Sequence, residues 1–407
     1  PKQTKRIEFD FNGKKVQGEF TLTGVDPGTT AIATSATDGT DDIITVTMED
    51  NSTWHDNLVI NLPVPTGTYG NITVTAYDAT SDGHAVLTLT KPIKSTGWTP
   101  TRKSSRKMTA TLPVFSVSAS KKVVFAPGNL VATVTAVTDG NPTAVSWAFH
   151  TNQYDRVYSS NSTQTFAVND KIDLFGWATS GYSSATTSDN TWVNYQPWAT
   201  SKSEGAVDKD KNKYEYGPST SNIASYASWN DDTHYETWKV CDWGHNAIGS
   251  YAADTWRTLT GGSGGEWKYL FSNRSASTVN GTSNARFAKA YLFGTTHGII
   301  LFPDVYNHPD GVAAPTGINA TDNTSWNANT YSAEDWTKME AHGAVFLPAA
   351  GFRNGTVVHY VGSHGFYWSC TAYNADNAYY LYFDSNYLNS DDNYYRNGGR
   401  SVRLATE

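Results

Sequence analysis

The sequence predicts two domains: an all-β antiparallel sandwich, followed by an α+β domain with two helices and long loops. We expect the sandwich to cover residues 1–113, a linker to cover 114–120 and the second domain to cover 121–407. Three observations support this division: the length, the distribution of aromatic residues and a change in hydrophobic periodicity. At roughly 100–200 residues per domain, a chain of 407 residues has room for two or three domains.

Aromatic residues are concentrated in the second part of the chain. Residues 121–407 hold 12 of the 14 Trp and 22 of the 24 Tyr. The first 120 residues therefore need a core of a different kind, which places a boundary near 113–121.

The first part alternates apolar and polar residues with a period of two, which is typical of half-buried strands. Turn clusters such as Asp38-Gly39 and Ser81-Asp82-Gly83 separate the alternating segments. No segment there has a helical pattern, so we expect a sandwich of about seven short strands. The alternating segments are 16–22, 43–47, 58–62, 71–77, 85–90 and 107–112.

The second part contains two helix signals. Ser332, followed by an acid at Asp335, is close to a capping box and opens a helix that carries Trp336 and Met339. The second candidate lies in residues 260–274, where Trp267, Leu270 and Phe271 share one helical face. The rest is predicted to be strand and loop.

Composition excludes several functional classes. The formal net charge is -8 and charged residues are 17% of the chain, so a dedicated nucleic-acid binder is not expected. No apolar run approaches the length of a transmembrane helix. Low Lys content with abundant Thr, Ser, Asn and Gly suits an exported β-rich protein.

Short motifs give no convincing catalytic or metal site, and we expect no cofactor. Gly261-Gly-Ser263-Gly-Gly265 matches a nucleophile elbow, but no buried strand precedes it, so we favour a lead-in to the helix of Trp267. Trp229-Asn230-Asp231 matches a calcium motif of sugar-binding lectins, but its partner tripeptide is missing and His308-Pro-Asp310 is only a distant relative of it.

The remaining reactive groups also favour structural roles. Cys241 and Cys370 are too few for a disulfide scaffold and form no zinc pattern. The acid pairs Asp231/Asp232 and Asp391/Asp392 are more typical of solvated turns than of glycosidase acids.

Residues 351–407 are the most informative stretch, with nine Tyr and no Lys. Alternation places Leu381 and Phe383 on the core side of a strand, with Tyr380, Tyr382 and Asp384 exposed on the other side. Tyr combined with Asn, Ser, Gly and Asp is also the composition of antibody paratopes. An ordinary Tyr-rich sheet is the alternative. The predicted ligand-binding residues, expected on one face, are Tyr373, Asn374, Asp376, Tyr380, Tyr382, Asp384, Tyr387, Asn389, Asp391, Asn393, Tyr394, Tyr395 and Asn397.

Several motifs in residues 121–407 support a family resemblance. They are Phe125-Ala-Pro-Gly-Asn-Leu130, Asp173-Leu-Phe-Gly-Trp177, Thr255-Trp-Arg-Thr-Leu259, Glu266-Trp-Lys-Tyr-Leu270, Leu347-Pro-Ala-Ala-Gly-Phe-Arg353, Gly365-Phe-Tyr-Trp-Ser369 and Gly399-Arg-Ser-Val-Arg403. Together they resemble the Fibrobacter succinogenes major paralogous domain, and more closely its retroelement-diversified variable proteins of gut Bacteroidetes. The resemblance implies a C-type-lectin-like fold with a variable-type region at about 351–403. The first part resembles a fimbrillin-type β-sandwich, on the strand pattern and Gly18-Glu-Phe-Thr-Leu22.

In such proteins, randomised adenines in AAC codons can give Asn, Tyr, Asp, Ser and several smaller residues, but not Lys or Trp. The predicted ligand-binding residues all belong to the reachable set, which also explains the missing Lys. Trp368, Leu381, Phe383, Leu388, Arg396 and Arg403 are then read as fixed scaffold. The family is related to formylglycine-generating enzymes, whose reactive cysteine pair has no counterpart here.

The resemblance implies a surface-displayed ligand-binding or adhesion protein, exported to the cell surface or pilus tip of a Gram-negative bacterium. Its partner would be a protein or glycan on another cell, a phage or a host surface, with other pilus subunits as a further expectation. Two alternatives stay open: a structural pilus subunit and a carbohydrate-active enzyme.

Overall fold

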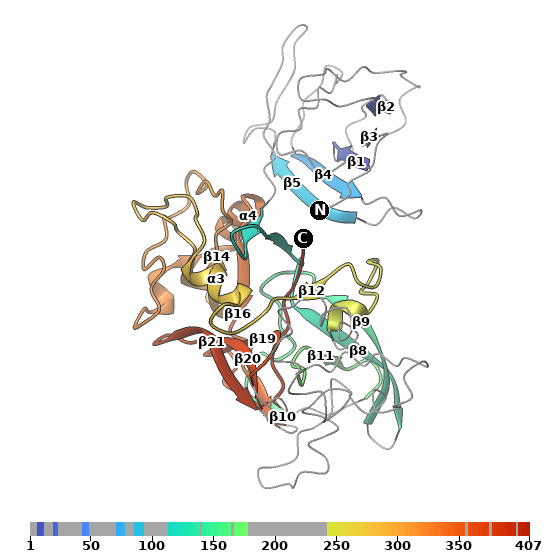
Figure 1. The fold of residues 1–407 in the computed structure, drawn as a ribbon, viewed down its shortest axis with the longest axis vertical. Coiled ribbons are helices and arrows are strands. Elements are labelled where there is room, and N and C mark those ends of the chain that lie inside the picture. Colours follow the sequence, from blue (N-terminus) through green and yellow to red (C-terminus); the bar gives the residue numbers. More distant parts are fainter. Residues whose placement is uncertain are drawn as a thin grey trace, which may run out of the picture. The chain divides into compact units, whose positions relative to one another are not determined.

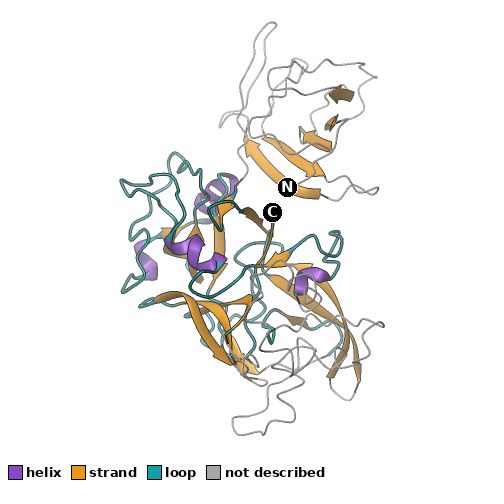
Figure 2. Ribbon diagram, viewed as in Figure 1, coloured by secondary structure: helices purple, strands orange, loops and turns teal. Residues whose placement is uncertain are grey.

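The computed structural model describes residues 6–11, 19–22, 43–48, 71–77, 85–92, 113–138, 141–163, 167–177, 242–354, 357–373, 377–395 and 398–407. The chain forms two compact units, Pro1–Thr111 and Leu112–Thr406 (Figure 1). The described residues are mostly β-strands in several sheets, with two α-helices (Figure 2). Neither helix is long and apolar enough to cross a membrane.

The first unit contains one five-stranded sheet among its described residues, in the order β2-β3-β1-β4-β5. Ile7, Ile44, Val46 and Ile72 are buried on it. The strands are β1 (Arg6–Asp10), β2 (Glu19–Leu22), β3 (Ile43–Met48), β4 (Asn71–Tyr77) and β5 (Ala85–Pro92).

Sequence alternation predicted β2 to β5 but missed β1, where Ile7 and Phe9 alternate with three charged residues. The expected strands at 58–62 and 107–112 lie outside the described residues. The expectation of a wholly antiparallel fold is wrong at one point, because β2 and β3 pair in parallel. A parallel pair needs a long connection, and residues 23–42 between these strands are long enough.

Residues 114–120 do not form a separate linker but belong to the second unit. β6 (Phe115–Ser116) pairs with β7 (Lys122–Phe125), and Phe115 and Val117 are 0% and 1% exposed. Alternation of Phe115, Ser116 and Val117 is a strand pattern, and burial of the apolar side chains outweighs the loop-like composition.

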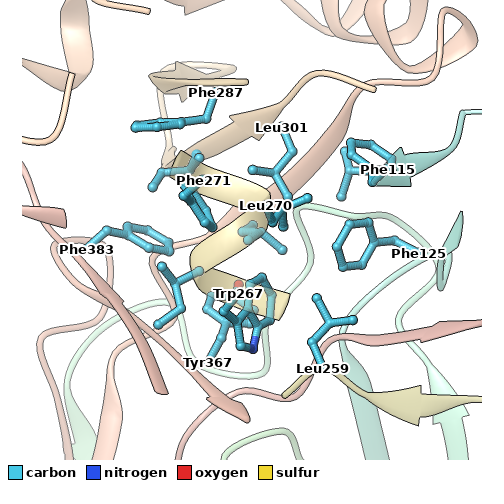
Figure 3. Packing of buried hydrophobic residues seen from close by; sticks show 14 of the residues in the cluster. Phe115, Phe125, Leu259, Trp267, Leu270, Phe271, Phe287, Leu301, Tyr367 and Phe383 are labelled. Atoms are coloured by element: carbon cyan, nitrogen blue, oxygen red, sulfur yellow. The ribbon is translucent and has the colours of Figure 1, made fainter. Parts of the chain in front are cut away.

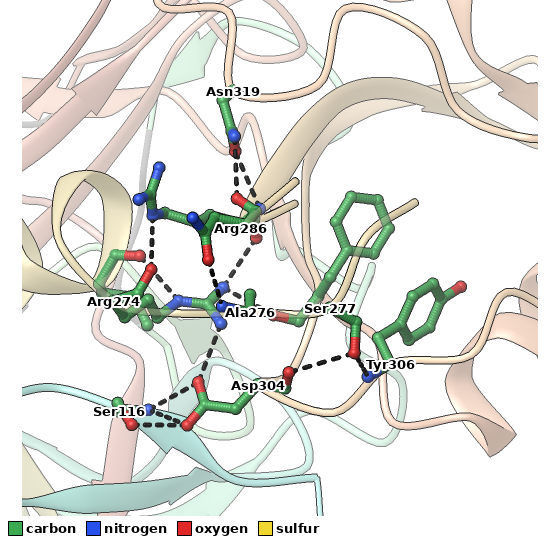
Figure 4. A network of polar contacts seen from close by, with 11 residues as sticks. Ser116, Arg274, Ala276, Ser277, Arg286, Asp304, Tyr306 and Asn319 are labelled. Atoms are coloured by element: carbon green, nitrogen blue, oxygen red, sulfur yellow. Dashed lines mark hydrogen bonds and ion pairs between the residues drawn. The ribbon is translucent and has the colours of Figure 1, made fainter. Parts of the chain in front are cut away.

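An ion pair fastens this segment to the rest of the unit (Figure 4). The backbone N–H and hydroxyl of Ser116 donate to the Asp304 carboxylate, at 3.0 Å and 2.5 Å. The fully buried Arg274 contacts the same carboxylate at 3.1 Å and also donates to the carbonyls of Arg286 and Phe302. A buried cation needs such partners, so this network fixes the start of the unit.

The second unit contains five small sheets, and only β13 and β15 pair in parallel among the strands described there. Besides β6 and β7, its strands are β8 (Leu130–Thr138), β9 (Asn141–Phe149), β10 (Ser162–Thr163), β11 (Lys171–Ile172), β12 (Arg257–Thr258), β13 (Phe287–Leu292), β14 (Thr296–Leu301), β15 (Thr330–Tyr331), β16 (Val345–Pro348), β17 (Phe352–Asn354), β18 (Val357–His359), β19 (Gly365–Ala372), β20 (Asn377–Phe383), β21 (Leu388–Tyr395) and β22 (Leu404–Thr406). The sheet orders are β10-β18-β17, β11-β8-β9, β12-β22-β7-β6, β15-β13-β14-β16 and β19-β20-β21.

Both predicted helices are confirmed. α4 (Ala333–Ala341) begins after Ser332, whose side chain and that of Asp335 form the complete capping box. α3 (Glu266–Ser272) buries Trp267, Leu270 and Phe271. Two 3₁₀ turns, η4 (Trp243–His245) and η5 (Trp326–Ala328), complete the described helical elements.

The sheet β19-β20-β21 has a hydrophobic core on each face. On one face, Trp267 and Phe271 of α3 lie in the same cluster as Tyr367, Leu381 and Phe383 (Figure 3). On the other face, the cluster contains Trp368 and Tyr380 from the sheet, together with Phe175, Trp177 and Trp243. The middle of this sheet is therefore covered on both sides.

Candidate functional site

The strand β20 confirms half of the predicted alternation. Leu381 and Phe383 are fully buried, as expected. Tyr380, however, is only 5% exposed and Tyr382 is half-buried, so the expectation that both face solvent is wrong for Tyr380. Alternation fixes which side a residue faces but not what covers that side, and here the second core covers Tyr380.

Seven rings form a connected cluster along this side of the sheet, which we call the aromatic strip, and Arg400 joins Tyr394 to the other rings. From one end, the Tyr360 and His364 centroids are 4.4 Å apart, those of His364 and Tyr382 5.9 Å apart, and those of Tyr382 and Tyr387 6.1 Å apart. Its members are Tyr360, His364, Phe366, Tyr380, Tyr382, Tyr387 and Tyr394.

Three tyrosines of the strip reach solvent. Tyr360, Tyr387 and Tyr394 are 50%, 50% and 51% exposed. Phe366 is only 8% exposed, and its ring centroid lies 5.1 Å from that of Tyr382. A surface of this kind offers large, rigid contacts at a low cost in conformational entropy.

Arg400 supports the strip from below. Its guanidinium carbon lies 4.2 Å from the Trp368 ring, 4.3 Å from the Tyr380 ring and 5.7 Å from the Tyr394 ring. Burial lowers the pKa of Arg400 to about 10, and the nearby Tyr380 phenol opposes that shift. The Tyr380 hydroxyl donates to Asp392 at 3.0 Å, so the cation, the rings and the carboxylate form one connected unit.

The loop after β20 carries Tyr387 and is held by Asp384. One carboxylate oxygen accepts from the backbone N–H groups of Asn386 and Tyr387, at 2.6 Å and 2.7 Å. The other accepts from the Tyr382 hydroxyl at 2.5 Å and lies 3.7 Å from His364 Nε2. Burial raises the pKa of Asp384, but these hydrogen bonds outweigh it, so the pKa lies below its ordinary value.

The same loop is fastened to residues 322–324. Asn323 and Thr324 donate their N–H groups to the carbonyls of Asn386 and Ser385, at 3.0 Å and 3.1 Å. The buried Lys289 ammonium also donates to the Ser385 carbonyl, at 3.1 Å. Burial lowers the pKa of Lys289, while Asp384 and Asp322 oppose that shift. Tyr387 is thus presented by a pre-ordered loop.

The predicted residues do not all share one face. Tyr394 and Tyr395 are neighbours at the end of β21 and pair with Ala378 and Asn377 of β20, but their ring centroids are only 5.0 Å apart, so the two rings lie together. Tyr373 packs on Tyr379, with 5.3 Å between the ring centroids, and Tyr379 lies on the same side of β20 as Leu381 and Phe383. Asp391 also lies there, 3.3 Å from Lys268 of α3.

The structure therefore divides the predicted set into two groups. Asn389 pairs with Tyr382 and belongs to the strip side, whereas Asn393 pairs with Tyr379 and belongs to the opposite side. Asn374, Asp376 and Asn397 lie outside the described residues.

The short motifs take structural positions where they are described. Gly261 to Gly265 forms a loop ahead of α3, and a Cβ at Gly261 would lie 2.5 Å from Tyr379 Cβ. Close packing thus explains why a glycine stands at position 261. The Gly261 N–H also donates to the Thr371 hydroxyl. Ser263 is exposed. The region of Trp229 lies outside the described residues.

Asp391 and Asp392 lie in a strand, not in the expected turn, and on opposite faces. They therefore cannot act as one glycosidase pair. Cys370 is a free, buried thiol, and burial raises its pKa well above the ordinary value, which makes it unreactive. Among the described residues, no three His, Cys, Asp or Glu side chains gather closely enough to hold a metal ion.

Sequence reasoning missed Tyr360, His364 and the supporting role of Arg400. Tyr360 and His364 precede the Tyr-rich tail and belong to a turn before β19, so strand alternation gives no signal for them. The sequence signal for Arg400 was its place in Gly399-Arg-Ser-Val-Arg403, one of the motifs that support the family resemblance.

Comparison with known proteins gives one family match. Residues 318–405 match a family described as a domain of unknown function, DUF8237. This segment includes the whole aromatic strip. No curated protein and no solved structure matches the chain.

Proposed function

We propose that this chain is a surface-displayed ligand-binding or adhesion protein that binds its ligand through the aromatic strip. The observation behind this proposal is that Tyr387 and Tyr394 are half-exposed on a rigid support of Arg400, Asp384 and a fastened loop. Exposed Tyr on a pre-ordered support favours binding, because little entropy remains to be lost.

The proposal also covers the fold family. We propose that residues 121–407 form a C-type-lectin-like domain presented by a fimbrillin-like sandwich at the cell surface or pilus tip. The sequence motifs named above support this, as do the small sheets and the two short helices. The buried Arg353, Arg400 and Arg403 lie in two of those motifs and are each at most 2% exposed, which is consistent with a scaffold role.

The experiment is a binding screen with the full chain on a glycan array and on an array of bacterial and host surface proteins. We expect at least one saturable ligand whose binding weakens about fivefold or more in Tyr387→Ala or Tyr394→Ala. Tyr373→Ala tests the opposite face, because Tyr373 is 47% exposed and packs on Tyr379; equal losses there would favour the broader set predicted from sequence. Absence of any saturable ligand, or ligands insensitive to all three variants, would contradict the proposal.

A further inference from the structure

The charges around the aromatic strip are arranged asymmetrically. Asp392 and Asp384 are only partly buried, and each accepts a hydrogen bond from a tyrosine of the strip. Among the described residues, the two cations associated with it are Lys289 and Arg400, which are 0% and 2% exposed. A ligand that approaches this part of the strip therefore meets carboxylates and phenol rings, while Lys289 and Arg400 are out of its reach.

The strip already binds one guanidinium of its own. Arg400 stacks within 4.3 Å of Tyr380 and 5.7 Å of Tyr394, with Asp392 beside them. The side chains of Tyr394 and Tyr387 remain 51% and 50% exposed. The rings and carboxylates that hold an internal guanidinium are thus the same kind of groups that a cationic ligand needs.

We infer that the occupant of the strip is a basic protein segment, whose arginine or lysine side chains stack on Tyr394 and Tyr387 and pair with Asp392 and Asp384. This inference rests on the proposed function and specifies its ligand class. The formal net charge of -8 adds a long-range attraction for such a partner. Arginine should bind better than lysine, because a planar guanidinium stacks on a ring and pairs with a carboxylate at once.

The test uses defined probes on the immobilised full chain. The probes are synthetic peptides of alternating Arg and Gly, with Lys–Gly, Asn–Gly and Glu–Gly peptides of equal length, measured by biolayer interferometry. We expect affinity in the order Arg, Lys, Asn, with no binding of the Glu peptide. Raising the salt from about 20 mM to about 300 mM should weaken binding of the two basic peptides.

Variants locate the binding. Tyr394→Ala, Tyr387→Ala and Asp392→Asn should each weaken Arg–Gly binding about twofold to fivefold. Asp392→Asn keeps an acceptor for the Tyr380 hydroxyl, so the fold is retained. Asp310→Asn is the matched control, because it removes the same charge from an exposed position elsewhere and should leave binding unchanged.

Three outcomes would overturn the inference: no binding of the basic peptides, equal binding of the Glu peptide, or an equal loss in Asp310→Asn. These results are distinct from failure of the proposed function. If the arrays yield a neutral ligand that is sensitive to Tyr387→Ala, the function stands and only the ligand class is wrong.

Discussion

Replacing Phe383 with Ala should strongly destabilise the second unit, whereas Tyr387→Ala should not. Phe383 is fully buried, 6.0 Å from Tyr367 and 6.3 Å from Trp326 by ring centroids. A Cβ added at Gly365 would lie 2.0 Å from the Phe383 ring, so backbone already packs against it. A buried aromatic ring removes about 150–250 Å² from water, worth about 4–6 kcal/mol at about 25 cal/mol per Å².

Because Ala retains part of that area, and the surrounding backbone cannot collapse into the space, we expect Phe383→Ala to lower the free energy of unfolding by about 3–5 kcal/mol. Tyr387 is half-exposed, so Tyr387→Ala should change the free energy of unfolding by no more than about 0.5 kcal/mol. The difference in unfolding free energy can be measured by urea unfolding monitored with Trp fluorescence. This signal reports mainly on residues 121–407, which hold 12 of the 14 Trp. With an m-value of about 3 kcal/mol per M, the Phe383→Ala midpoint should fall by about 1–1.7 M.

Both variants replace an aromatic side chain with alanine, at a buried site in one case and at a half-exposed site in the other. Equal midpoints for Phe383→Ala and Tyr387→Ala would refute the register of β20 and the assignment of the strip as surface. The same result would remove the basis for a binding face.

Three further perturbations test separate features. Tyr380→Phe should lose about 1–2 kcal/mol of stability in thermal melts, because it removes the hydrogen bond to Asp392 while leaving the ring in place; an unchanged melting temperature would contradict a buried, bonded phenol. Ser332→Ala should cost about 1 kcal/mol by chemical denaturation, since it removes the side chain that caps α4 and bonds Asp335. Asp384 has a lowered pKa in the folded state, so its contribution is present above about pH 4 and is lost as the pH falls through the folded pKa. The difference in unfolding free energy between the wild type and Asp384→Asn should therefore shrink as the pH is lowered below about 4, and a constant difference would exclude a depressed pKa.

Local patterns predicted local structure well. Ser332 with Asp335 marks the start of α4 because capping satisfies backbone N–H groups within four residues. Leu381 and Phe383 are buried as alternation requires. Such features depend on residues that are close together in the sequence, so the sequence alone is enough to predict them.

The errors arose where distant segments decide the outcome. Tyr380 is buried because it shares a cluster with Phe175, Trp177 and Trp243, none of which is adjacent in the sequence. His364 joins the strip only through tertiary contacts, and Tyr394 is linked to Tyr380 by Arg400 rather than by a residue of the same strand. Alternation within one segment contains no information on these partners.

The structure also limits how a diversified face could work in this chain. Tyr387 and Tyr394 are exposed, and changes there need not disturb the support formed by Arg400 and Trp368. Cys370 and Tyr380 are equally reachable from an AAC codon, yet they are 6% and 5% exposed. Substitution at a buried site changes a packed volume and costs stability, so variation there should favour residues of compatible size. If this face varies between copies, the exposed tyrosines are free to change the ligand, while the buried positions can vary only as far as the Arg400 support remains packed.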